Sequence, residues 1–145
     1  MRPAAVIAWF TGLGFGLPGA YGLWFLVDHD RVWMFLGFPT YGDGPFEDVG
    51  LDASPGLLTA FVVVCGLEVL AGCRLWARQR RGVLLACWLL PLELVFWIGF
   101  ALPFGFVLGA LRTGVLLADG DARTALRSRR ARPRAPRLTR RASGR

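Results

Sequence analysis

VLLACWLLPLELVFWIGFALPFGFVLGALRTGVLLA, the stretch from Val83 to Ala118, decides the fold. A helix needs about 20 apolar residues to cross the hydrocarbon core of a bilayer. This stretch is too long for one such helix and just long enough for two. Pro103 marks the break, because proline lacks a backbone donor and interrupts a helix. We therefore expect spans at 83–100 and 104–118, with a re-entrant segment as the alternative for the second.

Two further apolar stretches lie upstream, at 4–27 and 55–77. Pro55 suits the first turn of a helix, where a backbone donor is not needed. The first stretch could instead be a signal peptide, with Arg2 as its basic start and Ala20 at the cleavage site. A signal core is only about 7–15 residues long, whereas this run is longer, which favours a retained span. The sequence thus predicts an all-α, four-helix integral membrane bundle.

Composition separates this chain from small soluble proteins. Hydrophobic residues make up 54% of the 145 residues and charged residues only 19%. A soluble chain of this length has too little interior to bury so much apolar surface, whereas lipid can face it directly. Cys65, Cys73 and Cys87 all lie in apolar segments and His29 is the only histidine. We therefore expect no disulfide framework and no metal site.

The arginines predict the orientation in the membrane. All 17 basic residues are arginines, and ten of them follow Leu117. In the four-span arrangement this tail, Arg2 and the turn Arg78–Arg81 lie on one side, while Arg31 alone lies in the opposite loop, 28–54. Because basic residues remain on the cytoplasmic side, both termini are expected there, in the cell (cytoplasmic) membrane.

Aromatic residues are expected at the two membrane boundaries. The acidic outer loop contains five of them: Trp33, Phe35, Phe38, Tyr41 and Phe46. We interpret this loop as folded onto the membrane surface as an aromatic belt; a lid over a binding site is the alternative. The tryptophans expected at the inner boundary are Trp9, Trp76 and Trp88, and those at the outer boundary are Trp24, Trp33 and Trp97.

The segment 119–145 is rich in arginine and proline and has few apolar residues, so we expect it to be disordered. Its basic residues should fix topology and attract anionic lipid at about 1 kcal/mol each. The residues predicted to contact anionic lipid are Arg78, Arg80, Arg81, Arg129 and Arg130. Nucleic acid is the lesser alternative partner, because the tail is tethered beside the membrane.

Three ionisable residues interrupt the predicted spans: Glu68, Glu93 and Arg112. A charge at the centre of a bilayer costs about 2.5–3.5 kcal/mol on insertion scales, so such residues need partners. Counted from the cytoplasmic ends, they lie roughly 14, 15 and 9 Å deep at 1.5 Å per residue. The three side chains could therefore meet inside the bundle.

One arginine can neutralise only one of two carboxylates. The other carboxyl would bind a proton or share one with its neighbour. This chemistry suits proton-coupled transport or a hydrogen bond to a buried head group such as a quinone carbonyl; a purely structural ion pair is the alternative. Small residues that would let the helices approach closely are Gly66, Gly72, Gly105 and Gly109.

The block Gly66–Trp76, followed by a basic turn and Arg81–Ala86, resembles the DoxX-like group of small four-helix bacterial membrane proteins. Glu68 and Gly72 stand at the positions of that group's second-helix glutamate and glycine. The glycine-rich segment Gly12–Gly22 is similar to its first helix more loosely. The resemblance implies a cytoplasmic-membrane protein connected with respiratory or quinone-linked redox chemistry, often acting within an assembly.

Three functions follow as expectations. The leading one is a DoxX-like accessory or quinone-proximal component of a membrane redox assembly, working with an oxidoreductase partner. In it, Glu68 provides the polar contact, Arg112 its counter-charge and Glu93 the second carboxyl. The alternatives are a small proton-coupled transporter acting as a homo-oligomer and a structural scaffold that recruits partners through the tail. The sequence has no nucleophile–base pair, phosphate loop or metal motif, so no reaction is assigned.

Overall fold

The computed structural model describes residues 1–35, 38–42 and 44–120, and the predicted all-α class is confirmed. The helices are α1 (Arg2–His29), α2 (Pro45–Asp48), α3 (Pro55–Trp76), α4 (Arg80–Gly99) and α5 (Pro103–Ala118). Between α1 and α2, two antiparallel strands of two residues, β1 (Met34–Phe35) and β2 (Phe38–Pro39), form a small hairpin that the sequence did not predict. The predicted tail beyond residue 120, with Arg129 and Arg130, lies outside the described residues.

The helix ends follow from local chemistry. A proline occupies the first turn of α1, α3 and α5, where its missing N–H has no helical partner to lose. Ser54 caps α3, since its Oγ accepts a hydrogen bond of 3.3 Å from the Leu57 N–H. Helix α4 begins at Arg80, earlier than the expected apolar start at 83, because arginine is a good helix former whether or not it is buried.

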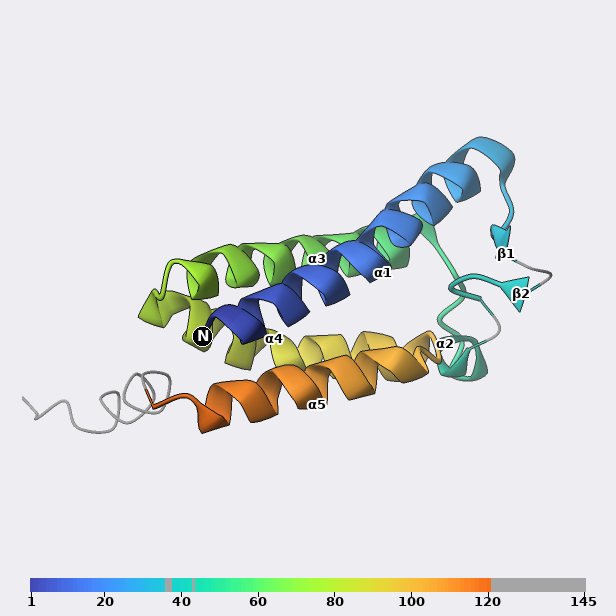
Figure 1. Cartoon of the computed structure of the whole chain (residues 1–145). Coiled ribbons are helices and arrows are strands. Elements are labelled where there is room, and N and C mark those ends of the chain that lie inside the picture. The colour runs from blue at the N-terminus through green and yellow to red at the C-terminus, as the bar shows by residue number, and fades with distance from the viewer. Residues whose placement is uncertain (36–37, 43, 121–145) are drawn as a thin grey trace, which may run out of the picture.

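The four long helices form a closed ring in the order α1, α3, α4, α5, in which each helix contacts two neighbours (Figure 1). The N-terminus, the α3–α4 turn and the end of α5 lie at one end of this ring. There the Met1 amino group forms an ion pair with the Asp119 carboxylate, which joins the start of α1 to the end of α5. The α1–α3 loop and the α4–α5 turn lie at the other end, beyond which the last turns of α1 project.

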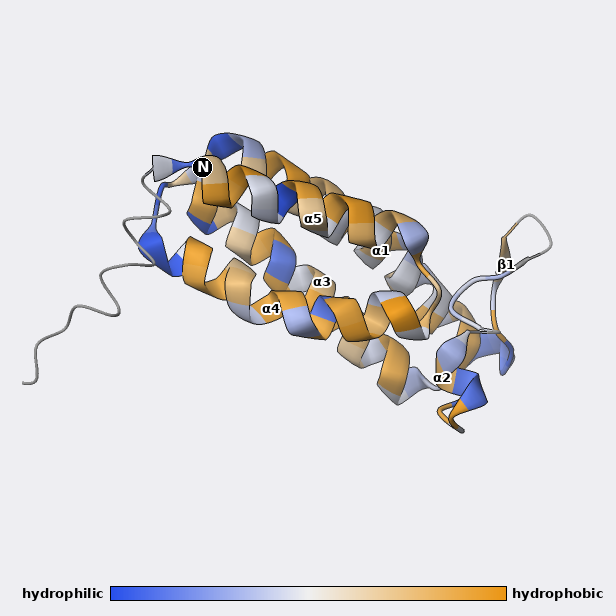
Figure 2. Cartoon of the chain, turned by 90° about the horizontal axis from the view of Figure 1, so that it is seen from below, coloured by the Kyte–Doolittle hydropathy of each residue, from blue (hydrophilic) through white to orange (hydrophobic). Residues whose placement is uncertain are grey.

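Three helices, α1, α3 and α4, are long and apolar enough to cross a membrane. Helix α5 is apolar but has only 16 residues, which corresponds to about 24 Å at 1.5 Å per residue. Figure 2 shows mostly hydrophobic residues along the helices, with hydrophilic ones at the two ends of the ring and also within α4 and α5. Large apolar side chains such as Phe10, Trp88 and Phe104 are exposed on its outside. These features suggest a multi-pass membrane protein.

Two apolar clusters fill the interior, one near each end. The cluster near the N-terminus contains Ala4, Ala5, Ala71, Leu75, Val83, Ala86, Leu89 and Leu116. The cluster near the loop contains Leu26, Tyr41, Leu58, Phe61, Val64, Cys65, Phe96 and Phe100. Along α3 and α4 the buried glutamates Glu68 and Glu93 lie between these two clusters, so the interior has an ionic layer between two apolar ones.

Only some of the outer-loop aromatics have the exposed position that the aromatic-belt prediction requires. Tyr41 is 4% exposed and packs inside the end of the ring, where its hydroxyl donates a 3.0 Å hydrogen bond to the Phe15 carbonyl. Phe46 packs edge-on against Phe100, with ring centroids 5.1 Å apart. The side chains of Tyr41 and Phe46 point inward because the bundle would otherwise have unfilled apolar space at this end, and close packing favours filling it.

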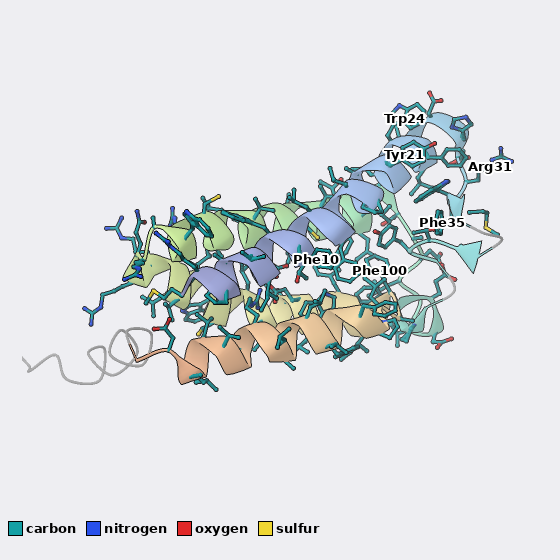
Figure 3. All side chains as sticks on the ribbon, viewed as in Figure 1. Phe10, Tyr21, Trp24, Arg31, Phe35 and Phe100 are labelled. Atoms are coloured by element: carbon teal, nitrogen blue, oxygen red, sulfur yellow. The ribbon has the colours of Figure 1, made fainter. Side chains whose placement is uncertain are left out.

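Trp33 and Phe35 of the loop lie near the projecting end of α1. Tyr21 and Trp33 meet edge to face, with centroids 4.8 Å apart, and Phe35 is exposed. Figure 3 shows Tyr21, Trp24, Arg31 and Phe35 together at this end, well away from Phe10. This group retains the exposed position that the belt prediction requires.

Trp97 lies in the last turn of α4, at the loop end of the ring, but it is 2% exposed and so does not face outward as a belt residue would. It lies against Gly105 and Gly109 of α5, whose lack of side chains leaves room for the indole. One prediction about packing is wrong. Gly66 does not mediate close packing, because a Cβ there would meet nothing within 4 Å. It stands about 200° around α3 from Glu68 at 3.6 residues per turn, so it faces outward. At Gly72, by contrast, the helices do approach closely.

Replacing Gly72 with alanine should lower the free energy of unfolding by about 1–3 kcal/mol, the cost of overpacking. A Cβ there would lie 2.6 Å from the Trp9 ring and 3.1 Å from the Ala5 carbonyl oxygen. The control on the same helix, Gly66→Ala, should be neutral or stabilising by about 0.5–1 kcal/mol, since alanine favours helices. Reversible unfolding in detergent measures both; equal effects would contradict the predicted contact between α1 and α3.

Tyr41 should stay protonated in the folded protein at pH values above the ordinary tyrosine pKa of 10, because burial raises its pKa. The unfolded chain then loses the proton first, so stability that is complete below pH 10 should fall as the pH rises further. The Tyr21→Phe variant leaves Tyr41 as the single tyrosine. Its tyrosinate absorbance should appear together with unfolding; ionisation of the intact fold near pH 10 would contradict this burial.

Candidate functional site

The ionic layer brings together Glu68 of α3, Glu93 of α4 and Arg112 of α5, which we call the triad. The three residues are 2%, 2% and 1% exposed. Each sits on the inward stripe of its helix, three or four residues from buried apolar neighbours, which is the spacing of one helical face. The predicted meeting of these three residues is therefore present in the structure.

Arg112 donates hydrogen bonds to both carboxylates. Its Nη1 lies 2.5 Å from Glu68 Oε1 and 3.0 Å from Glu93 Oε1, and its Nη2 lies 2.6 Å from Glu93 Oε2. Glu93 is thus held by the two-point fork that suits a planar guanidinium, whereas Glu68 receives one bond. Since α3 and α5 are not neighbours in the ring, the Glu68–Arg112 bond crosses its middle and links three helices.

The charges of the triad do not balance. Two carboxylates face one guanidinium, which leaves one excess negative charge if both are ionised. Such a charge away from water is costly unless it is paired or neutralised. Binding of one proton by the carboxylates would remove the excess, and the unequal bonding of Glu68 and Glu93 makes Glu68 the more weakly held of the two.

A cavity of about 90 Å³ lies beside the triad, between α4 and α5. Its lining residues are Ala86, Cys87, Leu90, Arg112, Thr113, Leu116 and Leu117. The Nε–H of Arg112 is buried and has no hydrogen-bond partner among the described residues. The sequence did not predict the cavity or the position of Thr113 in its wall. A threonine one position after the arginine belongs to no recognisable motif.

The other predicted site residues are distributed as follows. Gly72, Gly105 and Gly109 lie at close contacts, as described above. Arg78 and Arg81 are exposed at the α3–α4 end of the ring, together with Arg80. All three cysteines are free; Cys65 is buried, and Cys73 and Cys87 are exposed. Within residues 1–35, 38–42 and 44–120, no group of His, Cys, Asp and Glu has the arrangement of a metal site.

Comparison of the chain with models of known protein families, with curated proteins and with solved structures finds no match. The class of protein is defined by the fold and the triad alone. It is an all-α chain with three helices that could span a membrane and a charged layer in its interior. The resemblance to the DoxX-like group stays a prediction.

Replacing Arg112 with glutamine should lower the free energy of unfolding by about 3–5 kcal/mol, because two buried carboxylates then lose their counter-charge. The exposed Arg81→Gln on α4 serves as control and should change it by about 0.5 kcal/mol or less. Adding Glu68→Gln and Glu93→Gln to Arg112→Gln should restore part of the loss, since no charge is then left buried. Chemical unfolding in detergent measures all three; a triple variant no more stable than Arg112→Gln would contradict this electrostatic account.

Proposed function

We propose that the chain is a four-span protein of the cell membrane, with both termini on the cytoplasmic side. The ring supports this arrangement, because it gathers Met1, the arginine-containing α3–α4 turn and the end of α5 at one end. The opposite end carries the acidic loop and Arg31. Basic residues on one side only are what the positive-inside rule requires. Arg78, Arg80 and Arg81 would then contact anionic lipid.

The function that the geometry supports best is proton-linked chemistry within the bilayer. The observation that carries this proposal is the triad itself, in which two carboxylates contact one guanidinium and all three residues are at most 2% exposed. Residues of this kind inside a membrane protein are functional sites by default. In this proposal Glu68 takes up and releases the proton, while Glu93 remains paired with Arg112 through its two-point contact.

We propose that the protein is an accessory component of a membrane redox assembly of the DoxX-like kind. Its proton site would lie next to a lipid-soluble carrier such as a quinone. The position of the 90 Å³ cavity supports this assignment. It lies between α4 and α5, where the exposed Cys87 and Leu117 form part of its wall, so that it opens towards lipid. Proton uptake and lipid-soluble electron carriers are chemically linked, because reduction of such a carrier consumes protons.

The second candidate is a proton-coupled transporter that acts as a homo-oligomer. The excess carboxylate of the triad supports the transporter as much as it supports the redox role, because a proton carrier needs a group that is protonated and ionised in turn. The exposed apolar face of α1, with Phe10 and Leu17, would meet a second copy. A transport path would then lie between copies rather than through the packed ring.

Infrared spectroscopy of the full chain in nanodiscs tests the proton directly. The wild-type protein should show the carbonyl band of a protonated carboxyl that shifts on exchange into D₂O, and Glu68→Gln should remove it. The control is Glu47→Gln, which changes a carboxylate in the outer loop and should leave the band in place. A wild-type protein without this band would overturn the proposed proton site.

Native mass spectrometry of protein gently extracted from its own membranes separates the two candidates. Bound quinone or an oxidoreductase subunit, lost in Glu68→Gln, would support the redox role. A homo-oligomer with phospholipid alone, together with proton uptake by proteoliposomes that Glu68→Gln abolishes, would support the transporter.

A further inference from the structure

Helix α1 contributes a polar residue to the interior, Thr11, which the triad does not include. Thr11 is 1% exposed and the three triad residues are at most 2% exposed, so each of the four long helices supplies one of these buried residues. The Thr11 Oγ1 donates a 2.9 Å hydrogen bond to the Ile7 carbonyl, one turn earlier on α1. A hydroxyl has one hydrogen and two lone pairs, so the Thr11 oxygen can now only accept a further bond.

The packing of α1 on α3 places Thr11 at the depth of Glu68. A Cβ added to Gly12, the next residue, would lie 2.8 Å from the Cys65 carbonyl oxygen and 3.1 Å from the Val69 nitrogen. Residue 12 therefore lies against the turn of α3 that carries Glu68. Thr11 is displaced from it by a single residue, or about 1.5 Å along the helix.

The packing of α1 on α5 brings Thr11 towards Arg112. Phe15, one turn after Thr11 on the same face of α1, lines an apolar hollow of about 350 Å³ together with Leu108 of α5. Because α1 and α5 run in opposite directions, the step from Phe15 back to Thr11 matches the step from Leu108 forward to Arg112. Thr11 is thus buried between the α3 turn of Glu68 and the α5 turn of Arg112.

Glu68 has one oxygen available for a proton. Its Oε1 accepts the hydrogen bond from Arg112, whereas its Oε2 forms no hydrogen bond with any described residue. A proton taken up by Glu68 would therefore bind to Oε2. The resulting O–H is a buried donor, which costs free energy unless a nearby atom accepts its hydrogen bond.

Thr11 is the best-placed acceptor for this hydrogen. The titratable groups near Glu68 are Cys65 of α3, Glu93 of α4 and Arg112 of α5, with Tyr41 of the loop beyond Cys65; α1 has none between Arg2 and Tyr21. Both Glu93 oxygens already bind Arg112, which itself offers no acceptor, and a thiol accepts only weakly. The Tyr41 hydroxyl lies one turn further along α1 than Thr11, at the Phe15 carbonyl.

We propose that Thr11 accepts the hydrogen bond of protonated Glu68 and is a positioning residue of the proton site. An ionised Glu68 has no hydrogen to donate, so this bond exists only in the protonated state. Thr11 therefore favours proton uptake without taking up the proton itself. This inference rests on the proposed proton site and adds α1 to it, so that all four long helices form the site.

The chain offers matched variants for the test. Thr11→Val replaces the hydroxyl with a methyl group of similar size. Thr59→Val is the control, because Thr59 forms the same kind of bond, 2.6 Å to the Pro55 carbonyl, at an exposed position on α3. Thr11→Ser restores a hydroxyl, and Thr11→Ala removes it without a branched side chain in case valine does not pack. Each full chain is placed in nanodiscs, and the infrared carboxyl band that Glu68→Gln removes is followed as the pH rises.

Wild type, Thr59→Val and Thr11→Ser should lose the band at the same pH. In Thr11→Val and Thr11→Ala the band should move to higher wavenumber, because the carboxyl has lost its acceptor. The midpoint of its loss should fall by about 0.5–1 pH unit, the effect of one hydrogen bond to the neutral form. Thr11 variants with the band of the wild type, or an equal shift in Thr59→Val, would overturn the role of Thr11 alone. A wild-type protein without the band would overturn the proton site and this inference with it.

Discussion

The bond from Arg112 to two carboxylates is the constraint on which the rest of the structure depends. The guanidinium sits 1% exposed among apolar side chains, where it is tolerated only if its charge and most of its donors are matched. Matching requires α3, α4 and α5 to present Glu68, Glu93 and Arg112 at one depth and on inward faces. Because the Glu68–Arg112 hydrogen bond crosses the ring, it fixes how each of these three helices is rotated about its own axis. Apolar packing alone would specify these rotations less strictly.

An apolar layer packs on each side of this ionic layer. Towards the N-terminus the layer is built from alanine and leucine, so α1 and α3 approach closely, as the space at Gly72 shows. Towards the loop it is aromatic, and Tyr41 closes it from outside the helices. Both layers exclude water from the triad, which strengthens its hydrogen bonds and also raises the cost of any unmatched charge.

Much of this could be predicted from the sequence. The helices were predictable because runs of apolar residues of membrane-spanning length, interrupted by proline, have few other structures available. The triad was predictable because three charges at similar calculated depths have to find partners. The inward position of Trp97 and the outward position of Gly66 could not be predicted, because tryptophan enrichment and small-residue motifs are averages over proteins and do not specify which face a residue occupies. Tyr41 moved inward for a tertiary reason, the open end of the ring, that no local pattern records.

The short turn between α4 and α5 has a consequence for biogenesis. Glu93 and Arg112 belong to consecutive helices separated only by residues 100–102, and they share the two-point contact. In the proposed placement, this helical hairpin carries its own opposite charges as it enters the bilayer and can neutralise them before any other part of the chain arrives. An arginine that would delay insertion of an isolated helix is thereby compatible with a segment of only 16 residues. In that placement α5 can enter the bilayer after α4, because its counter-charge was delivered by the helix immediately before it.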